Sequence, residues 1–145
     1  MRVTLPNGTV IQARGLSDYV SVDGDRDPDY GLYLDDRWKH RVIPWPHVFV
    51  DWDDFGLPQD ERSLFDAIRH AWEIAQTGAS IEVGCYVGTG RTGTTVACLA
   101  VLGGVDAANA VVWTRENYDP WAVEGAQQED LVSRFASWIR DRPSR

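Results

Sequence analysis

Residues 80–102 constrain the fold more than any other part of this chain. An apolar segment at 80–84 predicts a strand, a glycine-rich loop follows at 85–93, and the segment from about 92 to 102 is apolar on every face. The last segment is therefore expected to be a helix buried at the centre of the molecule. Because strand, glycine-rich loop and buried helix in this order form phosphate sites in α/β folds, the sequence predicts an anion site at the loop.

The rest of the chain favours the same fold class. Asn7-Gly8 predicts a hairpin turn, residues 48–50 a buried strand, and residues 60–77, 105–117 and 124–141 three helices. Residues 15–46 contain Pro28, Pro44 and Pro46, which are expected to break up regular structure there. We expect an α/β protein with a central, mostly parallel sheet of four to five strands flanked by helices, in one domain spanning residues 1–145.

Charge and cysteine content exclude some classes of protein. The 145 residues carry 14 Lys and Arg against 22 Asp and Glu, a net charge of −8, which disfavours binding to nucleic acid or to anionic membranes. Two cysteines are too few for a disulfide framework, and neither a signal-like leader nor an apolar run of about 20 residues is present. We expect a cytoplasmic protein that binds neither nucleic acid nor membrane.

The chemistry of the chain is concentrated in residues 85–92, here called the cysteine loop, with the sequence Cys-Tyr-Val-Gly-Thr-Gly-Arg-Thr. The combination of Cys85, Gly88, Gly90, Arg91 and Thr92 at these spacings arises by chance with a frequency of about one in ten thousand. Glycines allow successive backbone N–H groups to point inward around an anion, and the following helix favours a nucleophilic thiolate. An arginine at this place holds two phosphoryl oxygens at once, which a lysine cannot do.

These residues resemble the signature of the cysteine-dependent protein tyrosine and dual-specificity phosphatases, which is Cys, five residues, Arg, then Ser or Thr. Residues 52–58, Trp-Asp-Asp-Phe-Gly-Leu-Pro, are similar to the mobile general-acid loop of that family, and its acid falls on Asp54. Residues 122–128 are similar to the segment that carries the family's water-positioning glutamine, which falls on Gln128. The resemblance implies a fold like that of the protein tyrosine phosphatases.

The resemblance also implies a two-step reaction that uses no metal or other cofactor. Cys85 attacks phosphorus while Asp54 protonates the leaving oxygen, and Asp54 then acts as base on a water oriented by Gln128. Thr92 is expected to donate a hydrogen bond to the sulfur. The phosphate oxygens are expected to be held by Tyr86, Val87, Gly88, Thr89, Gly90 and Arg91.

The sequence departs from the family pattern at two places. Gly84 stands where the family has a histidine that helps to hold the loop and to tune the thiolate, and Asp53 stands where the acid loop has proline. Asp53 is therefore an alternative general acid, and Asp51, although expected to be structural, is a further one. The missing histidine raises the alternative that the chain is a catalytically impaired module that binds phosphorylated partners.

Metal binding is not expected. His40, His47 and His70 show no ligand spacing. Asp23, Asp25, Asp27 and Asp29 alternate as in a calcium loop, but Pro28 occupies the glycine position of that motif and Leu34 the closing glutamate position.

Other notable residues have simpler interpretations. Cys98 is expected to be a small buried hydrophobe. Trp52 is expected to anchor the acid loop and Trp121 to line the cleft. Arg115 and Glu124 are interpreted as ordinary charges at helix ends, although Arg115 also resembles a structural arginine of the family.

We expect a monomeric phosphatase acting on phosphorylated proteins, with phosphotyrosine favoured and phosphoserine or phosphothreonine left open. Phosphoinositides and nucleotides are less favoured, because residues 86–90 contain no Lys or Arg to meet further phosphates. A sulfurtransferase or an arsenate reductase would also use a cysteine loop, but neither explains Asp54 and Gln128.

Overall fold

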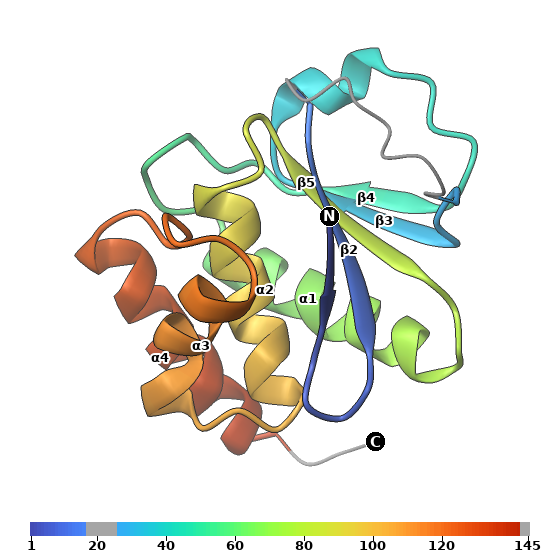
Figure 1. Cartoon of the computed structure of the whole chain (residues 1–145). Helices are drawn as coiled ribbons and strands as arrows, with labels where there is room; N and C mark the ends of the chain where they lie inside the picture. Colours follow the sequence, from blue (N-terminus) through green and yellow to red (C-terminus); the bar gives the residue numbers. More distant parts are fainter. Residues whose placement is uncertain (17–25, 143–145) are drawn as a thin grey trace.

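The centre of the molecule is a five-stranded sheet in the order β1-β2-β5-β3-β4 (Figure 1). The computed structural model describes residues 1–16 and 26–142. Only β1 runs antiparallel to its neighbour, so the predicted mostly parallel sheet of four to five strands is confirmed. The strands are β1 Arg2–Thr4, β2 Val10–Gly15, β3 Tyr30–Tyr33, β4 His47–Phe49 and β5 Ile81–Cys85.

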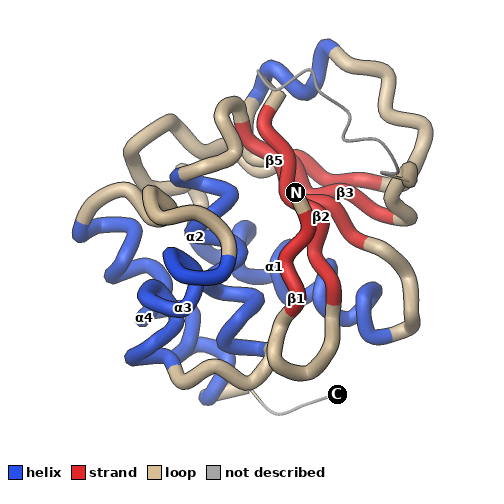
Figure 2. Tube along the Cα trace, viewed as in Figure 1, coloured by secondary structure: helices blue, strands red, loops and turns tan. Residues whose placement is uncertain are grey.

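Four α-helices lie to one side of this sheet (Figure 2). They are α1 Glu61–Gln76, α2 Gly90–Leu102, α3 Ala110–Asn117 and α4 Ala126–Arg140, and two short 3-10 helices, η1 Asp36–His40 and η2 Ala107–Asn109, complete the set in the described part of the chain. Helices α1 and α2 contact the sheet and each other, and α3 and α4 pack against α2. Because α2 is covered on all sides, 11 of its residues are buried, as its uniformly apolar sequence predicted.

Local signals account for the ends of several elements. The Asn7-Gly8 turn joins β1 to β2, and Gly8 has φ +92°, a conformation that favours glycine. Asp60 caps α1, since its side chain accepts the N–H of Ser63 at 3.2 Å. Helix α2 begins at Gly90, two residues before the predicted start, so that the last residues of the cysteine loop form its first turn.

Two predictions about strands are wrong. Residues 30–33, in the segment where prolines were expected to prevent regular structure, form the fully buried strand β3 between β5 and β4. Pro28 and Pro44 lie outside this strand and take no N–H from its ladder. The strand predicted as buried at 48–50 is the edge strand β4, which begins at His47 and pairs only with β3.

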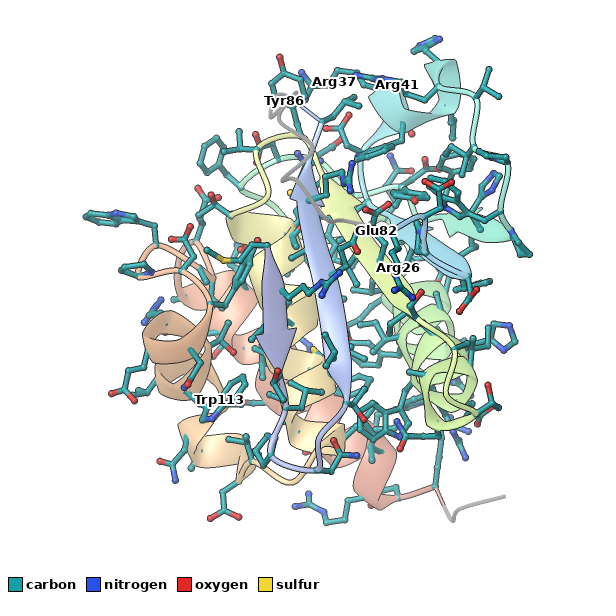
Figure 3. All side chains as sticks on the ribbon, turned by 45° about the vertical axis from the view of Figure 1, so that its right-hand side comes forward. Arg26, Arg37, Arg41, Glu82, Tyr86 and Trp113 are labelled. Carbon is teal, nitrogen blue, oxygen red and sulfur yellow. The ribbon has the colours of Figure 1, made fainter. Side chains whose placement is uncertain are left out.

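The alternation of side chains along β5 places Cys85 toward the helices. Ile81, Val83 and Cys85 belong to the apolar core, whereas Glu82 faces the other side of the sheet (Figure 3). There the Glu82 carboxylate accepts hydrogen bonds from Gln12 at 2.9 Å and from the Tyr33 hydroxyl at 2.6 Å. Burial and the nearby Glu82 raise the pKa of Tyr33.

Two features are absent from the described part of the chain. None of the helices at 1–16 and 26–142 is long and apolar enough to cross a membrane. In the same residues, no group of three or more His, Cys, Asp or Glu side chains is arranged to hold a metal ion. Asp23 and Asp25 of the calcium pattern lie outside the described residues.

Candidate active site

The cysteine loop connects the end of β5 to the first turn of α2 and is held by close backbone packing. The Cys85 sulfur accepts the N–H of Gly88 at 3.1 Å. Gly88 has φ +92°, and a Cβ built on Gly15 of β2 would lie 2.2 Å from the Val87 carbonyl oxygen. The Tyr118 hydroxyl also donates to the Gly88 carbonyl. The loop is therefore fixed by two glycines and a tyrosine before any ligand binds.

The Arg91 guanidinium is held by two backbone carbonyls and a carboxylate. Its side chain is 3% exposed, and its Nη1 donates to the carbonyl oxygens of Trp52 at 2.8 Å and Leu34 at 3.2 Å. Its Nη2 lies 3.0 Å from an Asp35 carboxylate oxygen. Its Nε is buried and has no hydrogen-bond partner among the described residues. This leaves a buried, oriented donor that an oxyanion would satisfy.

Asp35 is a member of the site that sequence reasoning missed. It follows β3 directly, and its carboxylate accepts two hydrogen bonds from the Arg37 guanidinium, each 2.8 Å long, in addition to its contact with Arg91. The hydrogen bonds from Arg37, helped by Arg91, hold the pKa of Asp35 well below its usual range. The signal that could have found it is its position at the carboxyl end of a buried parallel strand, where sites of α/β folds gather.

Arg37 in turn covers the cysteine loop. Its guanidinium carbon lies 3.4 Å from the centre of the Tyr86 ring, and the two side chains lie together in Figure 3. The chain from Arg91 through Asp35 and Arg37 to Tyr86 thus ties η1 to both ends of the loop.

The acid loop, residues 52–58, is anchored by Trp52, as predicted. The Trp52 side chain is buried and its indole N–H donates to the Gly56 carbonyl at 2.8 Å, closing the loop on itself. A single β-bridge joins Trp52 to Pro58. The loop is therefore pinned at its two ends while its tip faces outward.

Of the three aspartates in this region, Asp54 is the one that reaches the cysteine loop. Its carboxylate lies 3.6 Å from Arg91 Nη2 and lines the same cavity as Cys85. Asp53 is exposed and does not line that cavity. Asp51 faces Lys39 at 3.4 Å, in agreement with the structural role expected for it.

The cavity over the cysteine loop has a volume of about 260 Å³. Its lining residues are Asp54, Phe55, Cys85, Val87, Thr89, Gly90, Trp121 and Glu124. Phe55, Val87 and Trp121 are exposed apolar side chains at its rim, and Trp121 lines the cleft as predicted. A larger depression of about 750 Å³ lies at the other end of the sheet, near the β1–β2 turn, and no cysteine or histidine lines it.

Gln128 lies at the site, where its side-chain amide links three segments by hydrogen bonds. The side chain is fully buried, its oxygen accepts the Thr94 hydroxyl at 3.0 Å and the backbone N–H of Glu124 at 2.8 Å, and its nitrogen donates to the Gly56 carbonyl at 3.2 Å. One amide therefore joins α2, the acid loop and the segment before α4.

Glu124 lies inside the cavity, so its interpretation as an ordinary helix-end charge is wrong. Its carboxylate packs against Gly90 at the start of α2. Burial, followed by the nearby Asp54, raises the pKa of Glu124, and Arg91 partly opposes the change.

Thr92, the last residue of the cysteine loop, does not make the predicted hydrogen bond to the Cys85 sulfur. Its hydroxyl oxygen is buried and has no partner in the described ranges, and the donor that reaches the Cys85 sulfur is the Gly88 N–H. Its role toward the sulfur stays a prediction.

The position of the missing histidine is filled by another side chain. A Cβ built on Gly84 would lie 2.9 Å from the Trp38 ring and 3.2 Å from the Tyr33 ring, and these two rings are stacked with centres 4.4 Å apart. The Trp38 indole N–H donates to the Cys85 carbonyl at 2.9 Å. Trp38, which sequence reasoning did not single out, thus supports the nucleophile's backbone from the opposite face of the sheet.

The remaining predictions concern residues away from the cavity. Cys98 is buried in α2, and burial raises the pKa of its thiol. Arg115 acts structurally, because it donates to the carbonyl oxygens of Ala122 and Val123 at 2.9 Å each. Of the three histidines, His70 packs edge-on against Tyr30.

The sequence is similar to known proteins over most of its length. The family model for protein-tyrosine phosphatase matches residues 28–115. An uncharacterized protein of Methanocaldococcus jannaschii is 33% identical over 113 residues, which cover 72% of this chain and 74% of that protein.

Solved structures that share the fold include two phosphatases. The active form of Tk-PTP has a TM-score of 0.70 at 20% identity, covering 93% of this chain and 96% of that one. Kinase associated phosphatase, with serine in place of its catalytic cysteine, has a TM-score of 0.71 at 13% identity, covering 99% and 97%.

Proposed function

The chain belongs to the protein-tyrosine phosphatase family, and on this premise we propose that it hydrolyses phosphotyrosine in proteins through a phosphocysteine intermediate. Family membership supports phosphatase activity. The observation that carries the finer proposal is the meeting of Cys85, the first turn of α2 and Asp54 around one cavity, with Arg91 fixed 3.6 Å from the Asp54 carboxylate.

In the first step the Cys85 sulfur forms a bond to phosphorus as the phosphorus–oxygen bond to the tyrosine breaks. Asp54 gives its proton to the departing phenolate oxygen. The backbone N–H groups of residues 86–91 and the Arg91 guanidinium bind the phosphoryl oxygens and follow their charge into the transition state. The unsatisfied Arg91 Nε supports this role.

In the second step water attacks phosphorus, the phosphorus–sulfur bond breaks, and the water proton passes to a carboxylate. The family resemblance assigns the proton to Asp54, the orientation of the water to Gln128 and a hydrogen bond on the departing sulfur to Thr92. The reaction needs no metal or cofactor, because Arg91 and the loop N–H groups supply the positive charge and Cys85 supplies the nucleophile.

The rim of the cavity supports an aromatic phosphate ester as substrate. Phe55, Val87 and Trp121 present exposed apolar surface where the tyrosine ring would leave the pocket. The absence of Lys and Arg at residues 86–90 disfavours polyphosphorylated ligands. Phosphoserine and phosphothreonine stay within the proposal as slower substrates of a monomeric cytoplasmic enzyme.

The impaired binding module was suggested by Gly84. The Trp38 ring occupies that space, and its N–H holds the Cys85 carbonyl. The loop is therefore supported without a histidine, and an active enzyme is the better proposal.

The test is hydrolysis of p-nitrophenyl phosphate from about pH 4.5 to 8 with a chelator present. We expect metal-independent turnover that Cys85→Ser abolishes, and faster hydrolysis of phosphotyrosine than of phosphoserine peptides. Asp54→Asn should lower kcat by about a hundredfold or more, whereas its neighbour Asp53→Asn, the matched control, should not. A folded wild type without turnover would favour the binding module, and full activity of Cys85→Ser would exclude the cysteine mechanism.

A further inference from the structure

Glu124 is the one carboxylate of the cavity to which the proposed roles give no task. It lies in the segment that precedes α4 and packs against Gly90, the first residue of α2. A Cβ built on Gly90 would lie 2.0 Å from Glu124 Oε1. A carboxylate therefore lies, in the free protein, beside a residue whose N–H is expected to bind a phosphoryl oxygen.

The amide oxygen of Gln128 has no free position to accept a hydrogen bond from the hydrolytic water. The side chain is fully buried, its oxygen already accepts two hydrogen bonds, and its nitrogen donates to the Gly56 carbonyl. One of its acceptor bonds comes from the backbone N–H of Glu124 itself. Gln128 is thus a residue that positions Glu124, and Glu124 is the polar side chain of that segment that faces the cavity.

We propose that Glu124, in place of the Asp54 and Gln128 that the family resemblance implies for this step, orients the water that attacks the phosphocysteine and accepts its proton. The proposal rests on the proposed function. When the substrate phosphate binds the Gly90 N–H, the Glu124 carboxylate lies beside the phosphoryl group. Water then forms a bond to phosphorus, the phosphorus–sulfur bond breaks to release the Cys85 thiolate, and the water proton goes to Glu124.

The charges around Glu124 suit a proton acceptor. The groups that face it are Asp54 from the acid loop, Arg91 from α2 and Cys85 at the end of β5. Burial and Asp54 raise its pKa, which makes its carboxylate a stronger base, and a bound phosphoryl group adds negative charge to the same effect. The Asp54 carboxylate, in contrast, already accepts the Phe55 N–H at 3.1 Å and lies 3.6 Å from Arg91.

The experiment is rapid-mixing hydrolysis of p-nitrophenyl phosphate by Glu124→Gln, which keeps the size of the side chain and removes its negative charge. We expect kcat to fall by about a hundredfold, because general bases contribute on the order of 10² to 10⁴ in rate. The first turnover should stay fast, so that a burst of nitrophenol close to one equivalent per active site precedes a slow steady rate. Acid quenching and intact-mass analysis should find the phosphoryl group on Cys85.

The control is Glu116→Gln, an exposed glutamate on α3 that is expected to leave kcat unchanged and to give no burst. Formate added to Glu124→Ala should speed the decay of the phosphoenzyme, since a small carboxylate can enter the vacated space. Because the burst counts only active sites, a partly unfolded variant does not imitate the result.

Three outcomes would overturn the inference. Unchanged kcat in Glu124→Gln would show that Glu124 takes no part in the reaction. A slow reaction that accumulates no phosphoenzyme would show that Glu124 acts in the first step instead. A lower KM without a burst would mean that Glu124 only competes with the phosphate. If the wild type neither turns over nor forms a phosphoenzyme in any variant, the proposed function itself is refuted, and the inference with it.

Discussion

Replacing Gly84 by alanine tests whether the Trp38 ring has taken the place of the family's histidine. The new Cβ would lie 2.9 Å from Trp38 Cζ2, inside the distance that real Cβ atoms keep. The ring is stacked on Tyr33 and pinned by its N–H to the Cys85 carbonyl, so it cannot move away freely. Overpacking of this kind costs about 1 to 3 kcal/mol, which lowers Tm by roughly 2 to 12 °C in a chain of this size.

A double-mutant cycle separates this clash from other causes. Trp38→Phe removes Cζ2 and the indole N–H, and should cost about 1 kcal/mol, because the Cys85 carbonyl keeps the Leu16 N–H at 2.9 Å. In that background Gly84→Ala should be nearly neutral, giving a coupling of about 1 to 2 kcal/mol in urea unfolding. Histidine at position 84 should be tolerated only together with the smaller ring. Additive effects within about 0.5 kcal/mol would refute the reasoning.

Three further predictions concern the charged and sulfur groups of the site. Because its folded pKa is depressed, Asp35 contributes stability that is present above about pH 4 and lost as pH falls further, so melting curves of wild type and Asp35→Asn should converge in acid; curves that stay parallel would contradict this. Arg91→Lys should lower kcat/KM by about a hundredfold or more in steady-state assays, since lysine makes no bidentate contact, and a loss of only severalfold would speak against that contact. Iodoacetamide should label the native protein at Cys85 alone and also Cys98 after denaturation, as read by intact mass, because Cys85, although buried, lines the cavity, whereas Cys98 is enclosed in α2, where burial raises the pKa of its thiol; native labelling of Cys98 would show that α2 opens.

The sequence predicted the parts of the site that are encoded locally. The cysteine loop, the helix α1 and the acid loop with Asp54 each carry their signal within a few residues, as spacing, periodicity or turn chemistry. Strand β3 was missed because its burial comes from pairing with β5, some 50 residues away, which no local pattern records.

The site residues whose roles were missed also depend on contacts between segments that are distant in the chain. Asp35, Trp38 and Glu124 act on the cysteine loop from segments distant in the chain, and their side chains are common in turns and helix ends. Gln128 was found through its motif, but its hydrogen bonds depend on three segments meeting in the fold.

The hydrogen bonds of the Gln128 amide also affect when the active site can form during synthesis of the chain. Cys85, Arg91 and the acid loop all leave the ribosome before α4 does, yet the hydrogen bonds that join Gly56 of the acid loop to Thr94 of α2 run through the Gln128 amide on α4. In a nascent chain the tip of the acid loop is therefore expected to stay unaligned with Cys85 until the final helix docks. A ribosome-bound chain stalled before residue 128 should lack turnover. In this protein the helix made last is the one that closes the active site.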